Sequence, residues 1–285
     1  MPTALPLRPW PLRLLDALLY SSTWLALAAA AQTWVTLRHF GPLLPAAQRL
    51  VLLVLAATLL VYNLDAALPF KHGQPAGTSA RKAWQQRHRR LLAGLAAGAA
   101  VGGGALFLWD NWWQFVPQLL PLAGLALLYS WPLARWRGRP RALRDVPLLK
   151  VFLIAGVWTM VTAGLPTLLL HQPIGAVAGL LGQRFCLVLA LAIVFDIRDY
   201  SRDRRAGTRT FPGWLGVAGA RGVALGFLVL SAGLGLAWGA PVRVLLLTVP
   251  AAAAVILLAE ESRGDYFFAL VTDGVLLLPV LGYVL

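Results

Sequence analysis

Three aspartates at the end of an apolar stretch are the residues of this chain best suited to chemistry. They are Asp196, Asp199 and Asp203, and they lie within the sequence DIRDYSRDRRAGTRT (196–210). At about 100° per residue, a continuous helix places the three carboxylates on one face, within roughly 60° of one another. Three oxygen ligands on one face suit Mg²⁺, and Mg²⁺ suits the oxygens of a diphosphate. The alternative is a solvated, salt-bridged helix end, which a run of charges usually forms.

The metal-binding interpretation requires that no cation lies between the carboxylates. On the same helical arithmetic, Arg198, Arg202 and Arg205 fall on the opposite face, where they suit lipid headgroups or loop contacts. The spacing therefore predicts aspartates that face one another, with these arginines turned away.

The composition is that of an integral membrane protein. Of the 285 residues, 59% are hydrophobic and only 13% are charged, which is about half the charged share of a soluble domain. Apolar runs of about 20 residues recur, and each is long enough to cross a bilayer. They cover residues 16–37, 43–68, 89–109, 112–131, 147–170, 175–196, 214–238, 242–260 and 265–285. We therefore predict an all-α membrane protein, a bundle of nine transmembrane helices in one domain over residues 1–285.

The net charge of +14 gathers in alternate loops. The loops after the second, fourth and sixth segments carry most of the lysines and arginines. The opposite side carries Arg38, Arg49, Arg184 and Arg243. The positive-inside rule places the N-terminus and the basic loops in the cytoplasm and the C-terminus outside, for a multi-pass protein of the cytoplasmic or inner membrane. In a membrane chain this charge reflects topology and anionic lipids, and we expect no nucleic-acid partner.

A second polar patch ends the second segment. It contains Tyr62, Asn63 and Asp65, followed by Lys71. It reaches the same predicted face as the aspartates, so the two patches could oppose each other as a clamp for a diphosphate. The alternative is that Asn63 and Asp65 only cap a frayed helix end at the membrane interface.

A third patch follows the fourth segment, where Tyr129 and Ser130 precede a basic loop that contains Arg137 and leads to Lys150. Cations near a phosphate add affinity, and guanidinium groups match phosphate oxygens. Most of these cations are expected to set topology, and one or two to touch substrate.

Two features lie inside the predicted spans. Asp273 is an intramembrane carboxylate, which has either a function or a hydrogen bond to a neighbouring helix. Gly94, Gly98 and Gly102 form a seam at intervals of four residues, and this seam predicts close helix packing.

The aspartate segment resembles the second aspartate-rich motif of the UbiA superfamily of intramembrane prenyltransferases. The match includes the three aspartates, the Arg204 that follows them and the Ala-Gly-x-x-Thr tail at 206–210. Tyr129-Ser130-x-Pro132 with its basic loop is similar to the element after the family's fourth helix. Nine helices with three functional cytoplasmic loops are the family's architecture, so the resemblance covers nearly the whole chain in layout and is specific at the second motif.

The resemblance implies a UbiA-like bundle with an active-site cavity that faces the cytoplasm, in which Mg²⁺ assists the ionisation of a polyprenyl diphosphate. The allylic C–O bond breaks, and a lipophilic acceptor, aromatic or otherwise, captures the carbocation within the membrane. Cations stabilise the leaving diphosphate, and a dry pocket protects the carbocation from water. The expected site comprises catalytic Asp196, Asp199, Asp203 and Asn63; metal ligands from these four and Asp65; and diphosphate contacts from Lys71, Tyr129, Arg137, Lys150 and Arg204.

The second segment departs from the family's pattern. The family's first motif is usually Asn-x-x-x-Asp-x-x-x-Asp, whereas the positions counted from Asn63 hold Ala67 and Lys71. One interpretation is that the Lys71 ammonium replaces an Mg²⁺ as the counter-charge of a phosphate. Another is that the helix is distorted near Pro69, so that Asp65 still reaches the site. A third is that catalysis is weak or lost.

Three functions fit these residues. The preferred one is prenyl transfer to an acceptor, and the alternative is a UbiA-type terpene cyclase that converts a single prenyl diphosphate to a cyclic product. A non-catalytic lipid-binding or transport protein is the third. The intact second motif argues against the third function, because carboxylates at a membrane boundary are costly to keep without a use.

Overall fold

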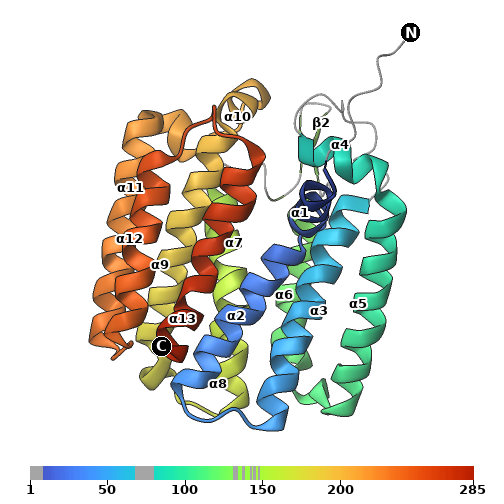
Figure 1. Ribbon diagram of the computed structural model, residues 1–285, viewed down its shortest axis with the longest axis vertical. Coiled ribbons are helices and arrows are strands. Elements are labelled where there is room, and N and C mark those ends of the chain that lie inside the picture. The colour runs from blue at the N-terminus through green and yellow to red at the C-terminus, as the bar shows by residue number, and fades with distance from the viewer. Residues whose placement is uncertain are drawn as a thin grey trace.

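The computed structural model describes residues 9–67, 80–130, 134–136, 139–141, 143, 146 and 148–285. The described chain is a bundle of helices that run along a common direction, with one short antiparallel hairpin (Figure 1). The helices are α1 (Trp10–Tyr20), α2 (Thr23–His39), α3 (Pro45–Ala67), α4 (Ala80–Arg87), α5 (Arg89–Trp109), α6 (Val116–Ser130), α7 (Leu149–Thr159), α8 (Leu165–Leu169), α9 (Ile174–Arg198), α10 (Tyr200–Ala206), α11 (Phe211–Ala237), α12 (Val242–Leu258) and α13 (Leu278–Val284). The hairpin consists of β1 (Ala134–Trp136) and β2 (Arg139–Arg141). Short 3₁₀ or π turns are η3 (Trp112–Phe115), η5 (Met160–Gly164), η6 (Phe267–Thr272) and η7 (Val275–Leu277).

The long apolar helices confirm a multi-pass helical membrane protein. In the described residues, six helical runs are long and apolar enough to cross a membrane: Pro45–Ala67, Arg89–Trp109, Leu149–Leu169, Ile174–Arg198, Phe211–Ala237 and Phe267–Val284. The pair α1 and α2 makes a seventh if its 58° bend belongs to one span. The other two predicted spans contain α6 and α12, which reach only about 22 and 26 Å against a hydrocarbon core of about 30 Å. The predicted count of nine is therefore not confirmed in the described part of the chain.

The helices pack on one another in a closed ring. Successive neighbours are α2 with α3, α3 with α5 and α6, α6 with α7, α7 with α9, α9 with α11, α11 with α12, α12 with α13, and α13 with α2. The last helix of the chain thus closes against the second. In Figure 1, α4 and α10 lie at one end of the bundle and the C-terminus lies at the other.

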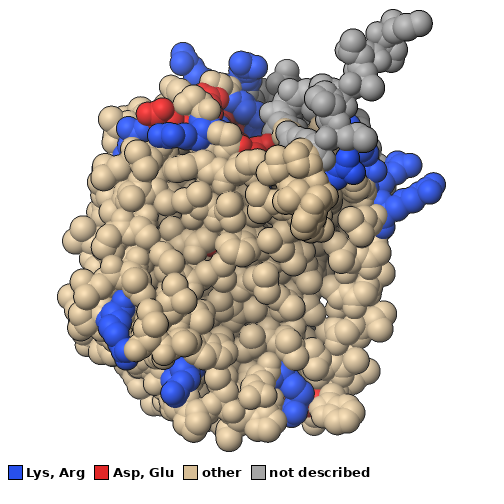
Figure 2. Space-filling view, in the orientation of Figure 1, with Lys and Arg blue, Asp and Glu red and all other residues tan. Residues whose placement is uncertain are grey.

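Charged side chains gather at the end that carries α4 and α10, which we call the charged end. In Figure 2 this end carries most of the lysines and arginines in view together with acidic side chains, and a broad uncharged surface lies below it. The opposite end has a few cations, among them Arg49, whose Nε donates to both carboxylate oxygens of Asp110 at 2.7 and 2.8 Å. This ion pair joins the start of α3 to the end of α5.

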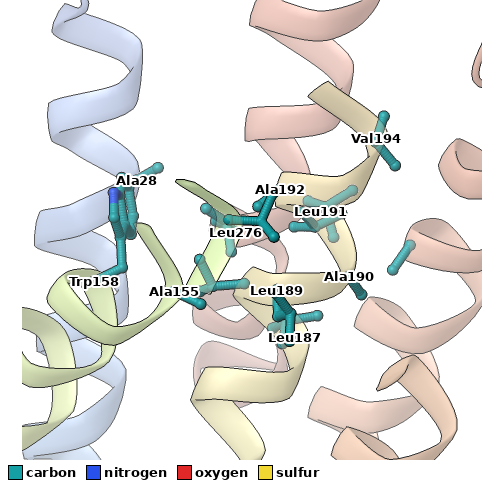
Figure 3. Close-up of a cluster of buried hydrophobic side chains, with 14 of the residues drawn as sticks. Ala28, Ala155, Trp158, Leu187, Leu189, Ala190, Leu191, Ala192, Val194 and Leu276 are labelled. Atoms are coloured by element: carbon teal, nitrogen blue, oxygen red, sulfur yellow. The ribbon is translucent and has the colours of Figure 1, made fainter. Parts of the chain in front are cut away.

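The centre of the bundle is packed with apolar side chains. Helix α9 supplies a long run of them, and Figure 3 shows Leu187 and Leu189 close to Ala155 of α7, and Leu191 and Ala192 close to Leu276 of η7. The close packing of these side chains holds the helices together through van der Waals contacts. The active-site cavity expected from the resemblance is not confirmed.

The predicted glycine seam does not pack within this chain. A Cβ added at Gly94, Gly98 or Gly102 would meet no described atom outside the local helix within 4 Å, so the packing prediction is wrong here. The close contact on α5 is instead made by Gly103, where a Cβ would lie 3.2 Å from Ala56 Cβ. The four-residue spacing identified the helix correctly and the packed face incorrectly.

We expect Gly282→Ala to destabilise the closure of the ring. A Cβ there would lie 2.7 Å from the Cα and the Cγ2 of Val244 and 2.8 Å from its amide nitrogen, so α13 must move away from α12. Such overpacking costs about 1–3 kcal/mol, which corresponds to a melting temperature in detergent lower by roughly 3–10 °C. The control is Gly98→Ala, an open helical site that should melt unchanged or slightly higher. Equal melting of the two variants would contradict the prediction.

Candidate functional site

The predicted aspartate cluster lies where α9 passes into α10 at the charged end. Helix α9 ends at Arg198, Asp199 interrupts the helix with φ −95° and ψ 7°, and α10 begins at Tyr200. Asp196 on α9 is almost fully buried, and Asp203 on α10 is buried as well. All three carboxylates are thus held at the boundary between the apolar bundle and its charged end.

Lys150 joins two of these carboxylates. This residue lies in the first turn of α7, and its Nζ lies 2.6 Å from Asp196 Oδ1 and 3.0 Å from Asp203 Oδ2. The side chains of all three are mostly shielded from solvent. The packing of α7 against α9 therefore brings together three residues that the sequence analysis had placed in two separate patches.

The prediction that arginines turn away from the aspartates is wrong for two of them. Arg198 donates from Nε and Nη2 to the two carboxylate oxygens of Asp199, each at 3.1 Å, and Arg202 Nη2 lies 2.6 Å from Asp199 Oδ2. The helix is interrupted at Asp199, so the arithmetic of one continuous helix does not hold there, and both arginines reach its carboxylate.

These arginines fix the charge of Asp199. Burial alone would raise its pKa, but Arg198, Arg202 and Lys150 outweigh burial, and the pKa of Asp199 is lowered from its ordinary value. The carboxylate is therefore ionised at neutral pH and is available to a cation once an arginine withdraws.

The cluster suits a divalent cation that is shared with a phosphate ligand. No group of three or more His, Cys, Asp or Glu residues within the described ranges is arranged to hold a metal by itself. Two carboxylate oxygens nevertheless converge on one cationic atom, Lys150 Nζ. Mg²⁺ is commonly bound by one or two carboxylates together with substrate phosphates and water. Asp196 and Asp203 fit that arrangement if the lysine moves to the phosphate.

The patch on α3 lies at the same end of the bundle. Asn63 is 1% exposed; its Nδ2 donates to Leu59 O at 2.9 Å, and its Oδ1 has no hydrogen-bond partner among the residues described. Asp65 is half-buried in the last turn of α3, and Lys71 lies outside the described residues. Within the described parts of the chain, Asn63 makes no hydrogen bond to the aspartate cluster, so their predicted cooperation stays a prediction.

Sequence reasoning counted Arg81 only among the topology-setting cations of a loop. It lies on α4, where its amide nitrogen donates to Asp265 Oδ2 at 3.1 Å and its Nη2 donates to Ser22 Oγ at 3.0 Å. Burial lowers the pKa of Arg81.

Asp273 lies between the two polar patches. The charges of Arg81 and Arg198 both act on it, and it makes no hydrogen bond or ion pair with another described residue. The alternative that Asp273 serves as a hydrogen-bond partner of a neighbouring helix is therefore not supported. Its position links the α3–α4 side of the charged end to the α9 side.

The structure shows no ion pair or hydrogen bond between the other predicted residues and the aspartates in the part of the chain that it describes. Tyr129 is half-buried near the end of α6, and Arg204 is exposed on α10. Arg137 lies outside the described residues. Of the predicted diphosphate contacts that the structure describes (Tyr129, Lys150 and Arg204), Lys150 forms ion pairs with two of the aspartates.

Comparisons with known proteins find no relative of this chain. No family model matches it, and no match is found among curated proteins or among solved structures. The case for a function therefore depends on the residues of the site.

Proposed function

We propose that this protein is an Mg²⁺-dependent prenyltransferase that ionises an isoprenoid diphosphate and transfers the prenyl group to a lipophilic acceptor within the membrane. The observation that carries the proposal is the convergence of Asp196 and Asp203 on Lys150 at the charged end of the bundle. Carboxylates that can share a metal, beside a cation that can bind a phosphate, are the two requirements of a diphosphate site.

Each charged residue of the cluster has its own role in this reaction. Lys150 would donate to a phosphate oxygen of the substrate, and Asp196 and Asp203 would hold Mg²⁺. The metal supplies positive charge to the leaving group when it is bound. The allylic C–O bond breaks with its electron pair on the diphosphate, and the acceptor forms the new bond and loses a proton. Arg198 and Arg202, already at Asp199, add charge where the diphosphate leaves.

The fold that we propose with this function is a UbiA-like bundle of nine spans. Its support is the closed ring of helices, in which α6 and α12 lie in line with the longer ones. We also propose that the charged end faces the cytoplasm and that the C-terminus lies outside, because basic residues favour the cytoplasmic side. An isoprenoid diphosphate would then enter the bundle from the cytoplasm, where its charged diphosphate group is solvated.

The function is tested by incubating the purified protein with geranyl, farnesyl and geranylgeranyl diphosphates, each with and without Mg²⁺. Diphosphate release and prenylated product are measured with and without a panel of aromatic acceptors. We expect Mg²⁺-dependent release that requires an acceptor. Release without acceptor, together with cyclic hydrocarbon or alcohol products, would instead identify a terpene cyclase. No binding and no turnover under any condition would contradict both.

A further inference from the structure

A buried arginine lies far from the aspartate cluster, in the opposite half of the bundle. Arg184 is on α9, twelve residues before Asp196 and therefore about 18 Å from it along the helix. It is 2% exposed. Nothing in the proposed prenyl transfer uses this residue.

The partners of Arg184 are all neutral. Its Nη1 donates to Gln32 O at 3.2 Å and to Thr162 Oγ1 at 3.0 Å, and its Nη2 donates to Thr36 Oγ1 at 3.2 Å. These bonds join α9 to α2 and to η5. No carboxylate forms an ion pair with Arg184 in the described parts of the chain, so its positive charge is not compensated.

Two donors near this charge have no acceptor. Arg184 Nε and Thr248 Oγ1 are both buried, and neither has a hydrogen-bond partner among the described residues. A buried donor without a partner costs about 1–3 kcal/mol, and an unpaired buried charge costs more. Arg184 and Thr248 both line one cavity, between α2, α9, α11, α12 and α13.

The size and lining of this cavity limit its ligand. Its volume is about 30 Å³. A water molecule needs about 10–15 Å³ on this scale, so the space suits one halide-sized ion with a water beside it. Other polar lining residues are Gln32, Thr36, His39, Gln183, Ser231 and Tyr283. Among the described residues that line the cavity there is no carboxylate, and Arg184 carries the formal charge.

We propose that this cavity binds a small inorganic anion, of the size of chloride or bromide, as the counter-ion of Arg184. The anion accepts from the guanidinium and from the Thr248 hydroxyl, and the unpartnered Gln32 Oε1 accepts from a water beside it. It thereby stabilises the junction of α2, α9 and α12. The proposal does not depend on the proposed enzyme activity, because the two sites share no residue.

The test is the melting temperature of the purified protein in detergent, with sodium chloride, sodium bromide or sodium gluconate at equal ionic strength. We expect chloride and bromide to raise the melting temperature by roughly 2–8 °C relative to gluconate. The reason is that an anion that binds the folded protein, and not the unfolded chain, stabilises the folded state. Arg184→Met should melt equally in all three salts. Arg243→Gln, which removes an exposed arginine of α12, should keep the full halide effect.

A second measurement covers the case in which Arg184→Met fails to fold. Crystals grown with bromide should show an anomalous peak in the cavity beside the Arg184 guanidinium. Thr248→Val, which keeps the size of the side chain and removes the hydroxyl, should reduce the halide-dependent rise in melting temperature. Equal melting of the unmodified protein in the three salts, or crystals with bromide absent from the cavity, would overturn the proposal.

Discussion

Asp203→Asn will lower the rate of diphosphate release by about 10²- to 10³-fold, the loss that follows removal of one preorganised electrostatic group from an active site. Asp203 and Asp196 are the two carboxylates that converge on one cation, at 3.0 and 2.6 Å. An asparagine keeps the shape of the side chain but removes the negative charge on which Mg²⁺ binding depends. The measurement is Mg²⁺-dependent diphosphate release from the allylic substrate that the unmodified protein turns over fastest.

Asp110→Asn is the matched control for this variant. Asp110 is also partly buried and paired with an arginine, Arg49, but it lies at the opposite end of the bundle. Because Asp110 lies away from the aspartate cluster, its replacement should leave diphosphate release within about twofold of the unmodified rate, even if it lowers the melting temperature. A folded Asp203→Asn protein with nearly full activity would show that the cluster is a structural ion-pair network.

Lys150→Met should separate metal binding from substrate binding, with effects of opposite sign. The ammonium now compensates Asp196 and Asp203, so its removal leaves two carboxylates that attract Mg²⁺ more strongly in the absence of substrate. The same change removes a charged donor to the diphosphate, which is worth about 1.5–3 kcal/mol, or roughly 10- to 100-fold in affinity. Calorimetric titration with Mg²⁺ alone, and then with a diphosphate analogue, measures the two effects.

The control for Lys150→Met is Arg49→Met, which also removes a cation from an aspartate and does so away from the site. It should change neither affinity. If Lys150→Met weakens both ligands, or leaves both unchanged, Lys150 does not exchange between the carboxylates and a phosphate, and the assignment of the cluster to diphosphate chemistry is wrong.

The helices of this protein were largely predictable because their signal is local. Apolar runs of about 20 residues mark spans regardless of what surrounds them, and each predicted segment contains helix in the described residues. The breaks within spans were not predictable in this way. The bend between α1 and α2 and the short α6 with its internal Pro121 decide how far each segment reaches, and the apolar pattern does not record them.

The contacts among the site residues were likewise predictable only where they depended on local sequence. Lys150 was selected as a candidate from its place after a basic loop, but its position between Asp196 and Asp203 depends on the packing of α7 against α9. Arg198 was assigned to the opposite face because a continuous helix was assumed, and the interruption at Asp199 cancels that geometry. Arg81 and Asp273 are separated by almost two hundred residues, and no pattern along the chain connects them.

By itself the sequence determined that this is a helical membrane protein with carboxylates at the end of one span and cations in alternate loops. Those properties depend on the transfer of local segments from water to lipid, which each segment's own residues decide. Only the tertiary structure decided which cation lies on which carboxylate, which glycine packs, and that Arg184 is buried without a counter-charge. These depend on contacts between segments far apart in the chain, and a distance of a few ångströms there decides whether a charge is paired or left alone.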